Sequence, residues 1–261
     1  MAMRMALLRR RCTALLLRPC SASLLSGRTS RYVTCTSSFT TSSADSNDDD
    51  GGGRSRRFRQ HVNPLAQQYR APIELPNWPA VFADPSLPIH LDIGCARGKY
   101  LMAVAHAHAR TTNYVGVEIR QNVIAEASHE AARRALANLA FVHANMNFQQ
   151  QLLLPSLPSA VASVSIFHPD PWMKKRHLKR RLVTHQFVSE LADLLQPGTP
   201  VYVQTDVEEL FEYMVEVFEH SQRYGFDALH ENPLGIPTDR ENFVRDQGGD
   251  IFRVKFIVEA K

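Results

Sequence analysis

Cysteine is scarce in this chain of 261 residues, and the few cysteines are unevenly placed. Three of the four lie within the first 35 residues, and Cys95 is the only one in the remainder. A single thiol can form neither an internal disulfide framework nor a cysteine-ligated zinc site. Histidine is more frequent, but His106 and His108 lie two apart on an expected helix and therefore face different ways. We expect no bound metal.

Acidic residues are absent before Asp45, and no apolar run is long enough to cross a membrane. Residues 1–44 carry seven arginines and many serines and threonines, a composition typical of an organellar transit peptide rather than a secretory signal. The Ser/Thr-rich part favours the chloroplast, whereas the arginines of the first twenty residues also fit the mitochondrion. Residues 45–57, rich in Asp, Gly and Ser, are expected to be a flexible linker. The folded domain is therefore expected to span residues 58–261.

The expected domain has no net positive charge, although the whole chain has a formal net charge of +4. From Phe58 onward the sequence contains 20 Lys and Arg against 22 Asp and Glu. Any affinity for nucleic acid must therefore come from a local patch. Residues 174–181 are such a patch, with six cations in eight positions. Alone, a run of this kind is more often a solvated face or a localisation signal than a nucleic-acid contact.

After residue 88 the sequence alternates short apolar runs with longer helical stretches. This order predicts an α/β fold with a mostly parallel sheet and helices on both faces. The expected strands are residues 89–93, 114–118, 139–143, 161–167, 201–205 and 251–258. The expected helices are residues 99–109, 121–137, about 180–195 and 207–221.

The first expected strand runs into a glycine turn, Leu91-Asp-Ile-Gly-Cys-Ala-Arg-Gly-Lys99. A dinucleotide-binding fingerprint beginning at Gly94 would need glycine at positions 96 and 99, where this chain has Ala96 and Lys99. The NAD-binding interpretation is therefore disfavoured. The spacing of Gly94, Ala96 and Gly98 resembles instead the first motif of Rossmann-like methyltransferases that use S-adenosylmethionine.

Polar residues end the next strands. Glu118 lies 20 residues beyond Gly98, where an acid can accept hydrogen bonds from ribose hydroxyls. Asp92 is placed to meet an ammonium group. Each acid could equally cap a turn or a helix, but together with the glycines they favour a nucleoside cofactor. Asn145 and Met146, after the third strand, could bond to and pack on an adenine, and Met146 could equally fill the core.

Asp170 lies between Pro169 and Pro171, directly after a strand and directly before the basic run. The prolines restrict the backbone on both sides, so the carboxylate is expected on a stiff turn at the carboxyl end of the sheet, where α/β folds bind ligands. Trp172 could stack on RNA bases or pack in the core.

These features together resemble the bacterial type of tRNA (guanine-N7-)-methyltransferase. The resemblance runs from about Arg59 to the C-terminus and is most specific in Phe167-His-Pro-Asp-Pro-Trp-Met-Lys-Lys-Arg-His-Leu-Lys-Arg-Arg181. The segments His61-Val-Asn-Pro-Leu65, Gln204-Thr-Asp206 and Pro237-Thr-Asp-Arg-Glu241 also match. Ala96 and His168 depart from the usual pattern.

The resemblance implies a Rossmann-like fold, S-adenosyl-L-methionine as cofactor, tRNA as partner, and methylation of a variable-loop guanosine without an obligatory protein partner. It assigns catalysis to Asp170. The implied cofactor positions are Asp92, Gly94, Gly98, Glu118, Arg120, Asn145 and Met146. The implied substrate positions are Lys174, Asp206, Thr238 and Glu241. The expected phosphate contacts are Lys175, Arg176, Lys179, Arg180 and Arg181.

Two other functions stay open from the residues alone. A small-molecule methyltransferase could share the scaffold, because fold does not fix substrate, but it would not explain the basic run. A non-catalytic RNA-binding module could retain the same fold. Which of Asp170, Asp206 and Glu241 would hold the guanine edge is also open.

Overall fold

The computed structural model describes residues 62–261. The expected transit peptide, the linker and the expected start of the domain at residue 58 lie outside the described residues. Residues 62–261 form a seven-stranded sheet in the order β3-β2-β1-β4-β5-β7-β6. Strands β1 to β5 run parallel, and β7 pairs antiparallel with both β5 and β6. The strands are β1 Ile89–Ile93, β2 Asn113–Glu118, β3 Leu139–His143, β4 Val161–Phe167, β5 Pro200–Thr205, β6 Tyr224–Ala228 and β7 Phe252–Val258.

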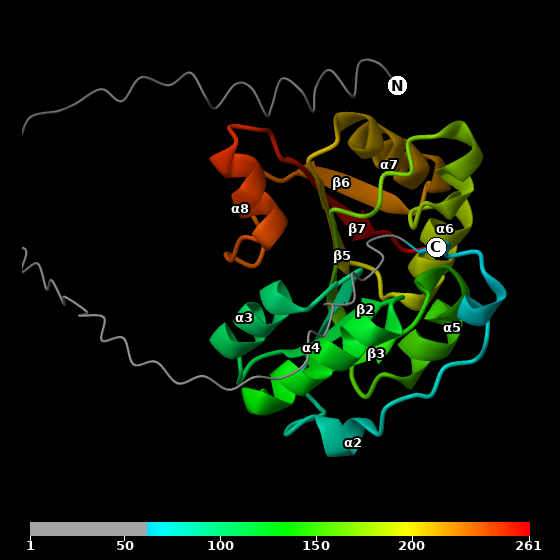
Figure 1. The fold of residues 1–261 in the computed structure, drawn as a ribbon. Helices are drawn as coiled ribbons and strands as arrows, with labels where there is room; N and C mark the ends of the chain where they lie inside the picture. The colour runs from blue at the N-terminus through cyan, green and yellow to red at the C-terminus, as the bar shows by residue number, and fades with distance from the viewer. Residues whose placement is uncertain (1–61) are drawn as a thin grey trace, which may run out of the picture. The chain divides into compact units, whose positions relative to one another are not determined.

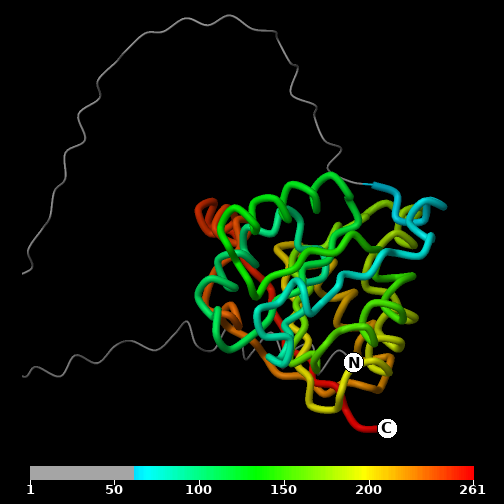
Figure 2. The backbone as a smooth tube through the Cα atoms, turned by 90° about the horizontal axis from the view of Figure 1, so that it is seen from below, coloured from blue at the N-terminus to red at the C-terminus, as the bar shows by residue number. Residues whose placement is uncertain are grey.

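Helices cover both faces of the sheet. On one side lie α3 and α4, and on the other lie α5, α6 and α7, whereas α8 lies beside α3 (Figure 1). The view at right angles shows helices on both sides of the central strands (Figure 2). The α-helices are α2 Trp78–Val81, α3 Lys99–Ala107, α4 Gln121–Arg133, α5 Met146–Ser156, α6 His185–Leu194, α7 Glu208–Ser221 and α8 Asp239–Asp246. Two 3₁₀ helices, η1 Gln67–Tyr69 and η2 Lys175–Arg180, complete the described elements.

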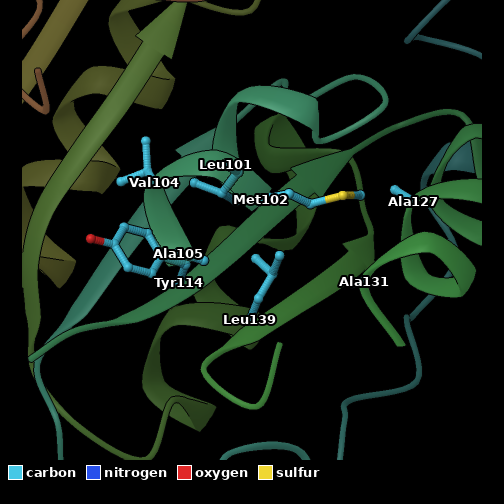
Figure 3. Packing of buried hydrophobic residues seen from close by; sticks show 8 residues of the cluster. All are labelled: Leu101, Met102, Val104, Ala105, Tyr114, Ala127, Ala131 and Leu139. Atoms are coloured by element: carbon cyan, nitrogen blue, oxygen red, sulfur yellow. The ribbon is translucent and has the colours of Figure 1, made fainter. Parts of the chain in front are cut away.

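The strands in the middle of the sheet are rich in apolar residues, as expected where helices cover both faces of a sheet. Every residue of β1 and β2 is buried. On the α3 and α4 side, Leu101, Met102 and Val104 pack with side chains of β2 and β3 (Figure 3). The strand members of this cluster, Tyr114 and Leu139, lie at the start of β2 and β3, so the packing holds α3 and α4 against that part of the sheet.

The predicted fold class is confirmed, and several boundaries match the prediction. The strands at residues 89–93, 139–143 and 161–167 have the expected ends. The helix expected over residues 180–195 is wrong at its start, because residues 175–180 form η2 and α6 begins only at His185 after the Thr184 cap. The elements α5, β6 and α8 were not predicted, and neither were the short helices α2, η1 and η2. α5 contains Pro155 and a run of glutamines, and α8 buries only two residues, so neither carries a clear apolar stripe.

Candidate active site

The strand order divides the predicted site residues into two groups. Strands β3, β2 and β1 carry the predicted cofactor positions at or just beyond their carboxyl ends. Strands β4 and β5, on the other side of β1, lead into the segments that carry Asp170 and Asp206. The chain adds strands on one side of β1 from β1 to β3 and on the other side from β4 onward. Such a switch point in strand order opens a ligand-binding crevice in α/β folds. The two groups therefore face one crevice from opposite sides.

The turn between β1 and α3 has three residues in the left-handed region. Gly94, Ala96 and Gly98 have φ angles of 89°, 48° and 65°. A Cβ atom on Gly94 would meet nothing within 4 Å, whereas one on Gly98 would lie 2.2 Å from Cζ of Phe141. Gly94 therefore leaves open space above the backbone for a ligand, and Gly98 is required for packing against β3. Ala96 holds a conformation that favours glycine, at a cost of roughly 1–2 kcal/mol.

Asp92 is buried at the end of β1, and a chain of hydrogen bonds reaches it through the sheet. Ser165 Oγ donates to Asp92 Oδ1 at 2.6 Å, and His90 lies between Ser165 at 3.0 Å and Ser163 at 2.7 Å. Burial raises the pKa of Asp92 to about 6, against the effect of the Ser165 hydrogen bond, and the charge of Glu118 adds to the rise. Burial also lowers the pKa of His90 to about 3, so the imidazole is neutral. An acid kept in such a place is suited to an ammonium group.

Glu118 and Arg120 form a two-pronged ion pair at the end of β2. Arg120 Nε donates to Glu118 Oε1 at 2.9 Å, and Nη2 donates to Oε2 at 3.1 Å. This bonding raises the pKa of Arg120, against the opposing effect of burial, and the charge of Asp170 adds to the rise. Asp170 therefore acts electrostatically on a cofactor-side residue. The predicted catalytic acid thus lies within electrostatic reach of the predicted cofactor-side residue Arg120.

The end of β3 ties the site to the N-terminal arm. Asn145 caps α5 through a hydrogen bond that its Oδ1 accepts from Asn147 N at 3.2 Å. Its Nδ2 donates to Pro64 O at 2.8 Å, and Gln149 Nε2 donates to Ala71 O at 2.5 Å. Met146 is only 2 % exposed, so core packing describes it in this structure. The matched arm segment thus rests on the start of α5.

Asp170 is exposed on a segment whose two ends are in the left-handed region. His168 has a φ of 49° and Trp172 a φ of 42°, and Pro169 and Pro171 lie between them. Positive φ is uncommon outside glycine and marks segments whose surroundings hold them in place. Asp170 therefore lies on an irregular segment whose backbone is restricted at His168, Pro169, Pro171 and Trp172.

The basic run folds over Trp172. His177 meets the indole edge-on at 5.5 Å between ring centroids, and the Arg180 guanidinium lies 5.1 Å above the ring. Four of the six cations of the run are exposed, namely Lys174, Lys175, Arg176 and Lys179. Trp172 supports this cationic turn from beneath and is itself partly covered.

Arg181 does not lie with the other cations, which corrects the prediction that it contacts phosphate. Its side chain is buried, Nε donates to Pro171 O at 2.8 Å, and the guanidinium lies 4.3 Å above the Tyr213 ring. The last cation of the run therefore turns inward. Arg181 instead holds the segment containing Asp170 against α7.

The substrate-side acids differ in exposure. Asp206 accepts hydrogen bonds from His168 Nδ1 at 2.9 Å and from Arg240 Nη2 at 2.5 Å. Burial raises the pKa of Asp206, but these two hydrogen bonds outweigh that effect and leave it below its ordinary value. Thr238 caps α8 by accepting from the backbone N–H of Glu241 at 3.0 Å. The structure thus assigns Thr238 a structural contact.

Glu241 is fully buried in a set of charged and amide groups. Its Oε1 pairs with Arg253 at 2.6 Å and with Arg245 at 2.7 Å. Its Oε2 accepts from Gln204 and Asn232, each at 3.2 Å. With both oxygens bonded and no exposed surface, Glu241 supports the substrate side from below. Asp170 and Asp206 are the acids nearer to solvent.

Sequence reasoning missed the partners of these acids. Arg253, Gln204 and Arg240 come from β7, β5 and α8, and only the fold brings them together. The match of residues 204–206 was the one signal that pointed to Gln204.

Within residues 62–261, no three His, Cys, Asp or Glu side chains are arranged to hold a metal ion. No helix in that range is long and apolar enough to span a membrane.

Comparisons with known proteins identify the family of the chain. The family model described as "Putative methyltransferase" matches residues 86–254. The tRNA (guanine-N(7)-)-methyltransferase of Microcystis aeruginosa is 44% identical over 207 residues, which are 77% of this chain and 98% of the relative. The enzyme of the same name from Synechococcus elongatus is 44% identical over 205 residues, covering 77% and 96%. The chain belongs to the tRNA (guanine-N(7)-)-methyltransferase family.

Solved structures bear on the fold of this methyltransferase. The 16S rRNA methyltransferase KamB matches with a TM-score of 0.50 and 15% identity, covering 72% of this chain and 95% of that one. At that identity the match concerns the fold alone. The predicted family and the predicted Rossmann-like fold are both confirmed.

Proposed function

We propose that this methyltransferase transfers a methyl group from S-adenosyl-L-methionine to N7 of a variable-loop guanosine in tRNA. The observation that carries the proposal is the meeting of two groups of residues at the switch point between β1 and β4. Glu118 and Arg120 lie at the end of β2 on one side of β1, and Asp170 follows β4 on the other side.

The cofactor side suits a nucleoside with an ammonium group. Glu118 offers a buried carboxylate for ribose hydroxyls, Asp92 offers a second acid for the ammonium group, and Gly94 leaves the backbone open to close approach. When bound, S-adenosylmethionine supplies a methyl group on a positively charged sulfur. The residues of this chain hold and orient that group.

The substrate side suits a base that needs no deprotonation. Guanine N7 carries a lone pair, so it can attack the methyl group directly, and positive charge moves onto the purine during transfer. Alignment of the two partners can then supply up to roughly 7–11 kcal/mol of the barrier reduction. The negative charge of Asp170, held on a rigid turn, stabilises the ring as it becomes cationic.

The cationic turn suits the phosphates of a folded RNA. Four exposed cations follow Asp170 within nine residues, in and just before η2, namely Lys174, Lys175, Arg176 and Lys179. Structured RNA is read largely through shape and phosphate contacts, so cations next to the acid would place the target base at the crevice.

Two measurements on recombinant residues 58–261 test the proposal. Calorimetry with S-adenosylmethionine should give heat of binding, and nucleoside mass spectrometry after incubation with unmodified tRNA and methyl-labelled cofactor should find labelled 7-methylguanosine. Binding without RNA methylation would favour a small-molecule methyltransferase. Absence of binding would favour an RNA-binding module.

We also propose that residues 1–44 direct the protein to an organelle, with the chloroplast favoured over the mitochondrion. The support is the arginine-, serine- and threonine-rich composition without acids. A fluorescent fusion of residues 1–57 should collect in chloroplasts, and a diffuse cytosolic signal would contradict the proposal.

A further inference from the structure

His168 connects the segment that carries Asp170 with the segment that carries Gln204 and Asp206. Its backbone N–H donates to Gln204 O at 2.7 Å, which continues the pairing of β4 with β5. Its ring then lies between two side chains, with Nδ1 at 2.9 Å from Asp206 Oδ1 and Nε2 at 2.9 Å from Gln204 Nε2. The side chain is only 11% exposed.

The surrounding groups fix which nitrogen of His168 carries the proton. Arginine can only donate, so the Gln204 atom that Arg253 Nε bonds at 2.6 Å must be the amide oxygen. The amide nitrogen of Gln204 therefore faces His168, and it also donates to the carboxylate of Glu241 at 3.2 Å. Since an amide nitrogen donates, Nε2 of His168 must accept.

The other ring nitrogen then carries the hydrogen. Nδ1–H of His168 donates to Asp206 Oδ1, while Arg240 donates to Oδ2. Asp206 is thus oriented from both sides, by a neutral donor and by a cation. Orientation of a carboxylate by partners behind it is how enzymes keep reacting geometry within narrow limits.

We propose that His168 is a positioning residue for Asp206 and acts only as the neutral Nδ1–H tautomer, so that methyl transfer is lost when the imidazole is protonated. This inference rests on the proposed function and on the substrate position that the family resemblance implies for Asp206.

Protonation would place two donors against each other. A proton on Nε2 would point at the Gln204 amide nitrogen 2.9 Å away. Gln204 cannot turn its amide over, because its nitrogen would then face the donor Nε of Arg253. The ring of His168 would have to move, and the hydrogen bond to Asp206 Oδ1 would be lost with it.

The charges around the ring act in both directions. Burial lowers the pKa of His168, and the hydrogen bond and charge of Asp206 oppose that effect. Arg240 on α8 lowers it further, and Glu241 on α8 raises it slightly. Arg253 of β7 lies behind Gln204 as seen from the His168 ring, and it donates hydrogen bonds to Gln204 and Glu241. The neutral form therefore prevails at pH 7, and the loss of activity is expected below the ordinary histidine range.

The first test is the pH dependence of single-turnover methyl transfer at saturating cofactor and tRNA. Wild-type protein should lose rate on the acid side, approaching about tenfold for each pH unit below the midpoint. His168→Asn keeps a side-chain amide that can donate to Asp206 and tolerates positive φ, but it does not titrate. Its rate should be lower than wild type at pH 7.5, and this acid loss should be absent.

Saturating cofactor distinguishes the effect of His168 from that of Asp92. Asp92 has a pKa of about 6, but its titration should affect cofactor binding rather than the rate at saturation. His220→Asn is the matched control, because His220 is exposed at the end of α7, and it should retain the wild-type acid loss. If His168→Asn keeps the acid loss as well, the proposal is wrong and His168 is only structural.

The second test does not depend on methylation. In ¹⁵N-histidine NMR spectra, the signals that disappear in His168→Asn belong to His168. At pH 7.5 they should show a protonated Nδ1 and an unprotonated Nε2, and the reverse tautomer would overturn the proposal. Absence of methyl transfer by wild-type protein at every pH would sink the proposed function and with it the role of Asp206, whereas the observed tautomer would still decide the geometry of His168.

Discussion

Arg120 grips the carboxylate of Glu118 with two side-chain nitrogens, Nε at 2.9 Å from Oε1 and Nη2 at 3.1 Å from Oε2. The backbone N–H of Arg120 donates to the same Oε1 at 3.0 Å. The acid at the end of β2 is therefore fixed before any ligand reaches it. A fixed acceptor loses little freedom on binding, which strengthens its contribution to affinity.

Glu118→Ala should weaken S-adenosylmethionine binding by roughly 1.5–3 kcal/mol, the range for a hydrogen bond to a charged group. Affinity for tRNA should stay nearly unchanged. Titration calorimetry with cofactor and a filter-binding assay with tRNA measure the two effects. Glu130→Ala, which removes a partly exposed acid of α4, is the control and should change neither. A variant at 118 that loses tRNA affinity and keeps cofactor affinity would show that the assignment is mistaken.

Asp92 should impose a stability cost that depends on pH. Its folded-state pKa of about 6 lies above the unfolded value. As the pH rises, the unfolded chain gives up this proton first, so the free energy of unfolding falls between the unfolded pKa and pH 6. Asp92→Asn removes this titration. The effect of the substitution on the free energy of unfolding should therefore be more favourable at pH 8 than at pH 5, by roughly 1 kcal/mol.

Urea denaturation of both proteins at the two pH values measures this difference. The same substitution should weaken cofactor binding, since it removes the acid placed for the ammonium group. An equal effect on stability at both pH values would mean that Asp92 titrates normally in the folded protein.

How far the sequence predicts the structure depends on how local the signal is. The strand ends at Ile93 and Phe167 were predicted correctly because buried apolar runs stop there and turn residues follow. Helix α8 was missed because it buries only two residues and is held by the ion pairs of Glu241 rather than by an apolar stripe. Likewise, a run of cations does not reveal that Arg181 turns inward, since that depends on Pro171 and on Tyr213 of a distant helix.

The difference between Arg181 and its neighbours gives a matched pair of variants. Replacing Lys175, Arg176 and Lys179 together with alanine should weaken tRNA binding and make the dependence of log affinity on log salt shallower, by about 0.7–0.9 for each phosphate that the variant no longer neutralises. Thermal stability should hardly change, because these side chains are exposed.

Arg181→Ala should act in the opposite way. It removes a buried hydrogen bond from a charged group and should lower the free energy of unfolding by roughly 1.5–3 kcal/mol. The salt slope of tRNA binding should remain that of the wild type. A shallower slope for Arg181→Ala, or an unchanged slope for the triple variant, would contradict the placement of the RNA surface.

Asp170→Asn keeps the shape of the turn and removes its charge. We expect the single-turnover rate to fall about 10²-fold, comparable with the loss of one preorganised electrostatic group, while cofactor affinity changes little. Asp227→Asn, on the edge strand β6, is the control and should retain the wild-type rate. A near-normal rate for Asp170→Asn would reduce Asp170 to a structural residue of the turn.

The most direct test of methyl transfer to guanine N7 changes one atom of the RNA. A tRNA carrying 7-deazaguanosine at the methylated variable-loop position has a C–H group in place of N7 and keeps the Watson–Crick edge. With methyl-labelled S-adenosylmethionine, the guanosine-containing tRNA should take up label and the 7-deazaguanosine tRNA should take up none, although both should bind the protein with similar affinity. Equal labelling of the two RNAs would show that the methyl group goes elsewhere.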